Sequence, residues 1–453
     1  MPESRRDVFA VASLYAIQLT LILSIVAAAN RQQLLTKEEV TSAFVCPSFL
    51  QLRLQHHVFS TNFYNYLFFS ITGDIFRNLY FARFTKAVVM AFLPPLIYLY
   101  LRRRFSVERL IAFFSAMAIG FLPGVVCFSW MGIEIGSDTL LAFFALFLAL
   151  FENSWAIATS LVVAAIAAGF YGSAFIFIPI VLLQQLLRFK QPQWRPPIIL
   201  GVILMIAVML FPIFWWTNVQ TLFLGGGRPA ATGAITRLAA LGRELFLKGD
   251  SYYFFSNGAP AFGTLLIGLV SVAALIYVAT RQPSKSWPLL AIAAGTLAVY
   301  AIAGNVPGVR RVIPLIVSLG MFAAVAFGML ARNRTWGIAA CLLLLASIAF
   351  ELRADSGIRT ALADSRITLP RDFDFRIPEG ETMESTLRSF IAGSRKVPDP
   401  LEGYEPDRTL ALLYRLTQPH PIVSSRDLVA ACDGHGWSIP STKPRLARLL
   451  RRQ

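Results

Sequence analysis

Long apolar segments recur along the chain, and they limit it to a fold that can reside in a membrane. An α-helix of about 17–22 mostly apolar residues is needed to cross roughly 30 Å of hydrocarbon. The composition agrees, because 56% of the 453 residues are hydrophobic and only 15% are charged. Soluble domains carry about 25% charged residues. The predicted fold class is therefore an all-α polytopic membrane protein.

Eleven membrane spans are predicted from these runs. Two longer polar segments, 30–85 and 217–258, are expected as loops between spans, and residues 352–453 as a small module after the last span. The predicted spans are 8–29, 86–101, 109–130, 138–152, 155–170, 173–189, 197–216, 259–280, 287–304, 312–331 and 335–351.

Basic residues in the short loops set the predicted orientation. Arg5 and Arg6 precede the first span, Arg102–Arg104 follow the second, and further Arg and Lys residues follow the sixth, eighth and tenth. All of these positions fall on one side, so the positive-inside trend places the N-terminus in the cytoplasm. An odd number of spans then puts both long loops and the C-terminal module outside.

The net charge of +16 is explained by the same loops. No helix-turn-helix, zinc-finger or RNA-binding signature accompanies it, and nucleic acid is therefore excluded as a partner.

An acidic pair, Glu38 and Glu39, stands just outside the first span at the head of the first outer loop. One interpretation is a solvated pair in a helix that begins after Thr36 as N-cap. The other is catalytic, because a carboxylate at a membrane exit can accept a proton from an acceptor hydroxyl or amine. His56 and His57 follow in this loop as candidate substrate-binding residues. They are adjacent in sequence, a spacing that indicates no metal site.

A second acidic site, Glu134 and Asp138, lies between the third and fourth spans on the same side. On one helix their i, i+4 spacing would bring like charges together. Protonation, a bridging cation, or a helix that begins after Glu134 would each relieve that repulsion. Asp138 also suits a helix N-terminus, so capping and function are both open for it.

A basic group completes the candidate residues. Arg310 and Arg311 fall on the outer side, against the positive-inside trend, and Arg228, Arg237 and Arg243 lie in the neighbouring outer loop. Long basic side chains readily snorkel to lipid headgroups. The alternative is a phosphate clamp, since the guanidinium fork matches phosphate oxygens.

Taken in order, these residues resemble the GT-C superfamily of polyprenyl-phosphate-dependent glycosyltransferases, which includes protein O-mannosyltransferases and aminoarabinose transferases. Glu38–Glu39 stand where that family carries an Asp-Glu pair, and residues 73–84 resemble its second helical region. Asp138 with Thr139-Leu140-Leu141 is similar to the acid that opens its next helix, and Arg310-Arg311-Val312-Ile313-Pro314 to its outer arginine. Two departures are a Glu as the first acid and Ile133–Glu134 in place of an arginine.

The resemblance implies a transmembrane catalytic domain over residues 1–351 in a bacterial inner membrane. It implies transfer of a sugar from a polyprenyl-phosphate donor to a glycan, lipid or protein acceptor at the outer face. Glu38 or Glu39 would be the general base, Asp138 would orient donor or acceptor, and Arg310 and Arg311 would bind the lipid phosphate. No cofactor is implied, and a divalent metal is left open.

Two rival functions remain at this point. A polysaccharide polymerase or ligase with a diphosphate-linked donor would use the arginines of 217–258. A lipid or glycan transporter would carry ionisable residues at mid-membrane, and the predicted spans are nearly free of charge in their centres.

Overall fold

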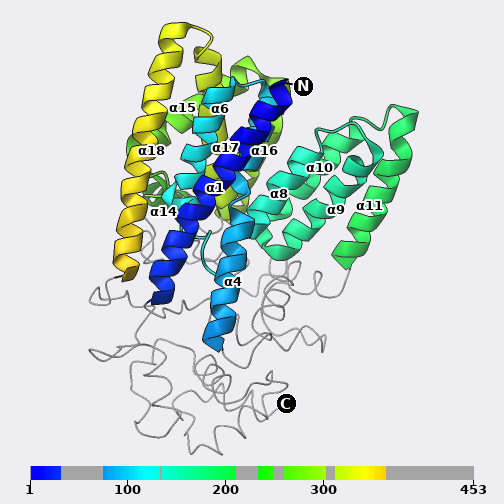
Figure 1. Ribbon diagram of the computed structural model, residues 1–453. Coiled ribbons are helices and arrows are strands. Elements are labelled where there is room, and N and C mark those ends of the chain that lie inside the picture. The colour runs from blue at the N-terminus through cyan, green and yellow to red at the C-terminus, as the bar shows by residue number, and fades with distance from the viewer. Residues whose placement is uncertain are drawn as a thin grey trace, which may run out of the picture.

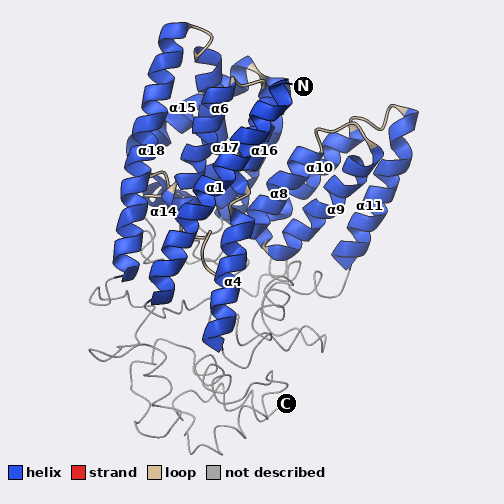
Figure 2. Ribbon diagram, viewed as in Figure 1, coloured by secondary structure: helices blue, strands red, loops and turns tan. Residues whose placement is uncertain are grey.

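The structure is a computed structural model in which residues 2–31, 75–132, 135–210, 233–247, 260–302 and 312–363 are described. All regular structure in these ranges is helical, and they contain no strand (Figure 2).

Every predicted span that lies in the described ranges contains at least one helix. The α-helices are α1 (Pro2–Arg31), α4 (Ile75–Met90), α5 (Leu93–Tyr100), α6 (Arg109–Phe121), α7 (Pro123–Val126), α8 (Ser137–Leu148), α9 (Ser154–Phe170), α10 (Phe177–Leu186), α11 (Arg195–Leu210), α14 (Ala234–Phe246), α15 (Leu265–Arg281), α16 (Pro283–Ile302), α17 (Ile313–Leu330) and α18 (Arg334–Ala363). A π-helix, η2 (Leu101–Phe105), and two 3₁₀ turns, η3 (Gly172–Ile176) and η4 (Pro192–Trp194), complete the set.

Five segments of the described chain are long and apolar enough to cross a membrane. They are Arg5–Ala29, Tyr80–Phe105, Pro192–Leu210, Ile313–Leu330 and Arg334–Asp355. Several shorter apolar helices pack beside them. Helices of this length and composition support an integral membrane protein, while the number of eleven spans stays a prediction.

The third predicted span, 109–130, differs from the structure. Helix α6 ends at Phe121, because Leu122 is extended (ψ 130°) and Pro123 begins the separate short helix α7. A residue before proline disfavours the helical region, so the chain breaks there. Residues 118–132 are nevertheless all buried. Non-helical backbone at this depth is tolerated only where protein covers it.

Two groups of helices make up the described structure. Figure 1 shows α8–α11 side by side on one flank and α1, α6, α15, α17 and α18 on the other. Helix α5 packs against both α6 and α8 and so joins the two groups.

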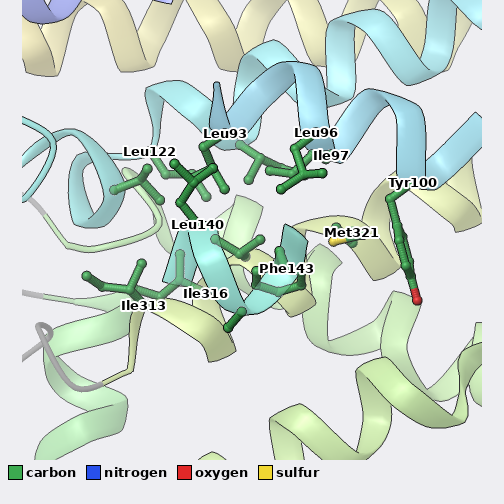
Figure 3. Packing of buried hydrophobic residues seen from close by; sticks show 14 of the residues in the cluster. Leu93, Leu96, Ile97, Tyr100, Leu122, Leu140, Phe143, Ile313, Ile316 and Met321 are labelled. Atoms are coloured by element: carbon green, nitrogen blue, oxygen red, sulfur yellow. The ribbon is translucent and has the colours of Figure 1, made fainter. Parts of the chain in front are cut away.

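The core at this junction is apolar and tightly packed. Residues of α5, α8 and α17 interdigitate there, among them Leu96, Phe143 and Ile316 (Figure 3). Small residues bring helices close elsewhere: a Cβ on Gly320 would lie 2.7 Å from Ile119 Cγ1. Between membrane helices such packing supplies much of the attraction, because lipid is as apolar as the side chains.

Alternating helix directions gather the basic loops at one end, at the top of Figure 1, which we term the basic end. Arg104 there donates to the carbonyls of Ser284 and Lys285, and Arg103 stacks over Phe151 at 4.0 Å. The opposite end is termed the far end. The clustering follows the predicted pattern, and which end faces the cytoplasm stays a prediction.

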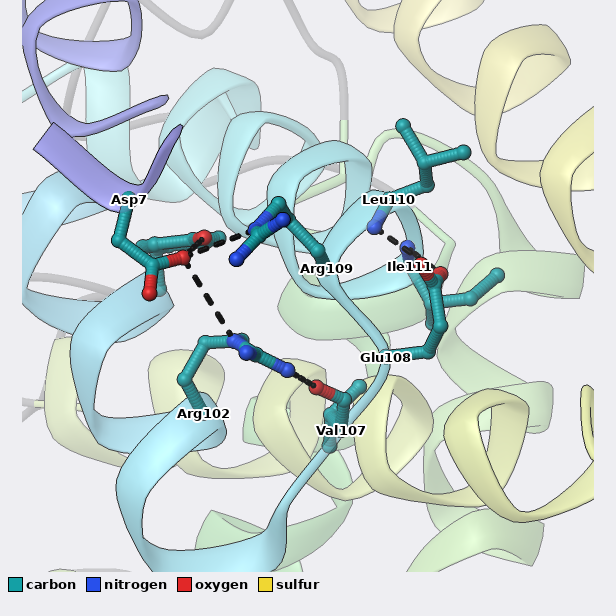
Figure 4. Close-up of polar contacts among 8 residues, drawn as sticks. Asp7, Arg102, Val107, Glu108, Arg109, Leu110 and Ile111 are labelled. Carbon is teal, nitrogen blue, oxygen red and sulfur yellow. Dashed lines mark hydrogen bonds and ion pairs between the residues drawn. The ribbon is translucent and has the colours of Figure 1, made fainter. Parts of the chain in front are cut away.

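A polar cluster fastens α1 to this end (Figure 4). The Asp7 carboxylate accepts hydrogen bonds from Tyr98 Oη and, at 3.0 Å, from Arg109 Nε. Arg102 Nε lies 3.9 Å from the same oxygen, and Arg102 Nη1 donates to the carbonyl of Val107 at 2.8 Å. One carboxylate thus connects α1, α5, η2 and α6.

Replacing Asp7 with Asn should loosen α1 at the basic end. The amide keeps an acceptor but loses the charge that two guanidinium groups face, a loss worth about 1 kcal/mol in this half-exposed setting. The apparent midpoint of thermal unfolding, followed by tryptophan fluorescence in detergent, should fall by about 2 °C. Glu152→Gln, which neutralises an exposed carboxylate of the same end, is the matched control. An equal shift in both variants would contradict the role of the cluster.

Candidate functional site

Three of the predicted site residues, Asp138, Arg237 and Arg243, lie in the described ranges. The others lie outside the described residues: Glu38, Glu39, His56, His57, Glu134, Arg228, Arg310 and Arg311.

Asp138 lies in the first turn of α8 and is 1% exposed. Gly136, in a left-handed conformation (φ 90°), begins the turn, and its N–H donates to Asp138 Oδ1 at 2.8 Å. Ser173 Oγ, from η3, donates to Oδ2. The carboxylate therefore turns back toward the preceding loop and η3, and no side chain caps α8 at Gly136. This geometry agrees with both interpretations of Asp138, because the carboxylate accepts backbone N–H groups of Gly136 and Thr139 at the start of α8 and also a side-chain hydroxyl from η3.

A buried lysine accompanies Asp138. Lys86, on α4, is 0% exposed, and its Nζ donates to the carbonyl of Ile135 and to Ser137 Oγ, each at 2.7 Å. The ammonium also interacts electrostatically with the Asp138 carboxylate. A buried charge is costly unless it is hydrogen-bonded and near an opposite charge; two hydrogen bonds satisfy the ammonium, and the Asp138 carboxylate is near enough to interact with it electrostatically.

Arg83 lies one helical turn before Lys86 on the same face of α4 and is also 0% exposed. Its guanidinium carbon is 5.1 Å from the centre of the Trp130 ring, a cation–π distance. Gly132 lets the loop approach α4 closely, because a Cβ there would lie 2.9 Å from the Cβ of Ala82. Two cations and one carboxylate thus converge where α4 meets the buried loop before α8.

Lys86 and Arg83 are functional candidates that were not singled out from the sequence, where they marked only the end of a loop. Their position in the sequence is the feature that indicates these two residues. They are spaced i, i+3 at the start of an apolar segment, on the side that the positive-inside trend leaves poor in basic residues.

Arg237 lies on the amphipathic helix α14, whose Leu241 and Leu245 are buried. Its Nη2 donates to the carbonyl of Ala301 at the end of α16, while its buried Nε and Nη1 have no hydrogen-bond partner within the described ranges. Arg243, in the last turn of α14, is exposed. The two arginines therefore differ: of the two, only Arg237 has sheltered N–H groups without a partner in the described ranges.

Asp138 and Arg237 do not touch each other, but both attach to elements that pack on α16. Ser173, the partner of Asp138, belongs to η3, and a Cβ on Gly295 of α16 would lie 3.3 Å from Ile176 of that turn. Arg237 binds the same helix at Ala301, about 9 Å further along its axis. Helix α16 thus links the acidic site and the arginine.

Metal-binding clusters are absent from this part of the molecule: in the described ranges no three His, Cys, Asp or Glu side chains converge.

No family model and no curated protein matches the chain. Among solved structures it is similar to the crystal structure of ArnT from Cupriavidus metallidurans bound to undecaprenyl phosphate. The similarity covers 89% of this chain and 76% of ArnT, with 15% sequence identity and a TM-score of 0.46.

Lys86 and Asp138 should behave as a coupled pair in a double-mutant cycle. Lys86→Met and Asp138→Asn each leave the other buried charge without its opposite charge, although its hydrogen bonds to neighbouring groups remain, so each single variant should lose about 2 kcal/mol of stability. The double variant should lose less than the sum, with a coupling energy of about 1–3 kcal/mol. Unfolding in mixed detergent micelles measures all four proteins. Strict additivity would show that the two charges do not interact.

Proposed function

We propose that the protein transfers a sugar from a polyprenyl-phosphate donor to an acceptor at the far end of its helices. The observation that carries the proposal is the buried group of Lys86, Asp138 and Arg83 at the junction of α4 and α8. Intramembrane ionisable residues are costly, and they commonly mark a functional site. The sequence resemblance to GT-C glycosyltransferases supports the same function.

In the proposed reaction an acceptor hydroxyl or amine attacks the anomeric carbon of the donor sugar. The bond from that carbon to the phosphate oxygen breaks, and polyprenyl phosphate leaves with the bonding electrons. The acceptor proton passes to a carboxylate, for which Glu38 or Glu39 is proposed, and Asp138 orients the donor or acceptor. No nucleotide or cofactor takes part, and the scheme requires no metal.

Negative charge accumulates on the departing phosphate in this reaction. Preorganised cations in a water-poor site stabilise such charge more strongly than they would in water. Lys86 and Arg83 supply cations beside Asp138, and the sheltered N–H groups of Arg237 offer a further phosphate contact. Arg310 and Arg311, and with them Arg228, are proposed for the same role.

The remaining partners follow from this scheme. The acceptor is a glycan, a lipid or a protein with a free hydroxyl or amine, and His56, His57 and Glu134 are proposed to contact substrate. The proposed location is a bacterial inner membrane with the N-terminus in the cytoplasm and the C-terminal module outside.

The general base can be tested by neutralising each carboxylate of the loop. One of Glu38→Gln and Glu39→Gln should lower transfer about 100-fold or more, as is typical when a general base is lost, and Asp138→Asn should also lower it. Release of labelled sugar from a polyprenyl-phosphate donor, measured in membranes that contain the variant, is the readout. Glu152→Gln at the basic end should keep wild-type activity. Full activity in both loop variants would refute the assignment of the base.

The donor class can be tested at α14. Arg237→Gln should weaken binding of polyprenyl phosphate about tenfold, because charge-assisted hydrogen bonds are lost, and Arg243→Gln should have a smaller effect because Arg243 is exposed. Binding is measured in nanodiscs, with Arg332→Gln at the basic end as control. Repeating the series, with Arg228→Gln added, for polyprenyl diphosphate distinguishes the two donor classes. A loss confined to the diphosphate would favour the polymerase or ligase.

A further inference from the structure

Helix α18 carries two buried carboxylates that the proposed transfer reaction does not use. Glu351 and Asp355 are spaced i, i+4, so they project from the same face of the helix one turn apart, and they are 0% and 1% exposed.

The two carboxylates lack the partners that buried charges usually have. Ser347 Oγ donates to Glu351 Oε1 at 2.8 Å. Glu351 Oε2 and both carboxylate oxygens of Asp355 have no hydrogen-bond partner in the described structure, and no basic side chain there pairs with either residue. The charge of Asp355 also acts on the Glu351 carboxylate. In the described structure, three buried carboxylate oxygen atoms on adjacent turns of α18 are therefore available to bind a cation.

A cavity of about 50 Å³ adjoins Glu351, between α6, α15, α17 and α18. Its wall is largely apolar, but Ser115 lines it and is 2% exposed, with an Oγ that has no partner among the described residues. One water molecule requires roughly 10–15 Å³ of such space. The cavity therefore has room for several waters, and it holds a polar group that can bind one.

The pair lies at an end of the hydrophobic segment and not at its middle. The apolar run of α18 ends at Phe350, the charged stretch Glu351-Leu352-Arg353-Ala354-Asp355 follows it, and α18 continues to Ala363 at the far end (Figure 1). Glu351 packs beside the turn at Gly263, where a Cβ would lie 3.6 Å from Glu351 Cγ. An ion from the far-side solution would not need to cross the hydrocarbon core to reach this position.

We propose that Glu351 and Asp355 bind one hard divalent cation of the Mg²⁺, Ca²⁺ or Mn²⁺ class. The ligands are Glu351 Oε2 and the carboxylate of Asp355, and waters complete the coordination shell. Oxygen-only ligands select hard cations, which commonly retain several waters. Ser347 holds the other oxygen of Glu351, as the outer-shell partners of metal-bound carboxylates do. Two positive charges neutralise both carboxylates.

The proposal is tested with the full-length protein in nanodiscs, stripped of metal by a chelator and titrated with Mn²⁺. Electron paramagnetic resonance of the free ion gives the stoichiometry and the dissociation constant. The wild type should bind one Mn²⁺ per chain, and the ion should raise its apparent unfolding midpoint. Glu351→Gln and Asp355→Asn should each weaken binding about tenfold or more. Glu152→Gln, a carboxylate at the basic end, should leave binding unchanged.

Two results would overturn the proposal. One is a wild type that binds no Mn²⁺ with a stoichiometry near one, a measurement that does not depend on any variant folding. The other is a protonated-carboxyl infrared band that persists with Mn²⁺ present and is lost in Glu351→Gln, because a shared proton would then occupy the place assigned to the ion. Transfer activity does not enter either readout, so the outcome is separate from that of the proposed reaction.

Discussion

A single ammonium group, that of Lys86, holds together the part of the molecule where α4, the buried loop and α8 meet. It donates to a carbonyl and to a hydroxyl from residues only two apart, Ile135 and Ser137. The described residues between α7 and α8, 127–132 and 135–136, are buried and non-helical, so their carbonyls need donors from elsewhere in the protein. Lys86 provides one such donor, and in doing so it places a positive charge beside Asp138. Local folding and the electrostatics of the candidate site thus depend on the same contact.

Charged side chains at the two ends of the helix assembly differ in how far they are buried. At the basic end, the Asp7 carboxylate forms partly exposed ion pairs with Arg102 of η2 and Arg109 of α6, and these pairs fasten the helices. Toward the far end, the ionisable groups are nearly or fully buried, with Lys86 and Asp138 on one side of the helix assembly and Glu351 and Asp355 on another. Partly exposed charges such as those at the basic end are common where membrane helices meet solvent. Buried charges such as those toward the far end are costly and commonly mark a functional site.

The sequence predicted the helices well because apolar length is a strong signal, and it predicted the gathering of the basic loops for a similar reason. It did not predict where the helix from Arg109 ends, although Pro123 was visible, since the apolar run continues past the break. Arg83 and Lys86 were overlooked because their function depends on a loop more than 40 residues away in sequence. Glu351 lay at the edge of a predicted span and Asp355 beyond it. Only the packing of α18 reveals that both are enclosed.

The π-helix η2 has a consequence for the tolerance of this chain to changes in length. Its wide turn, closed by the left-handed Ser106 (φ 56°), sends three consecutive arginines to three different neighbours: Asp7, the Phe151 ring and the α16 N-terminus. Removing one residue from the turn would shift its arginines relative to the neighbours that they contact. All three contacts would then be lost together, although no arginine had been changed. Spacing is therefore as much a part of this junction as residue identity, and a homologue that shortens the turn would have to fasten its helices in another way.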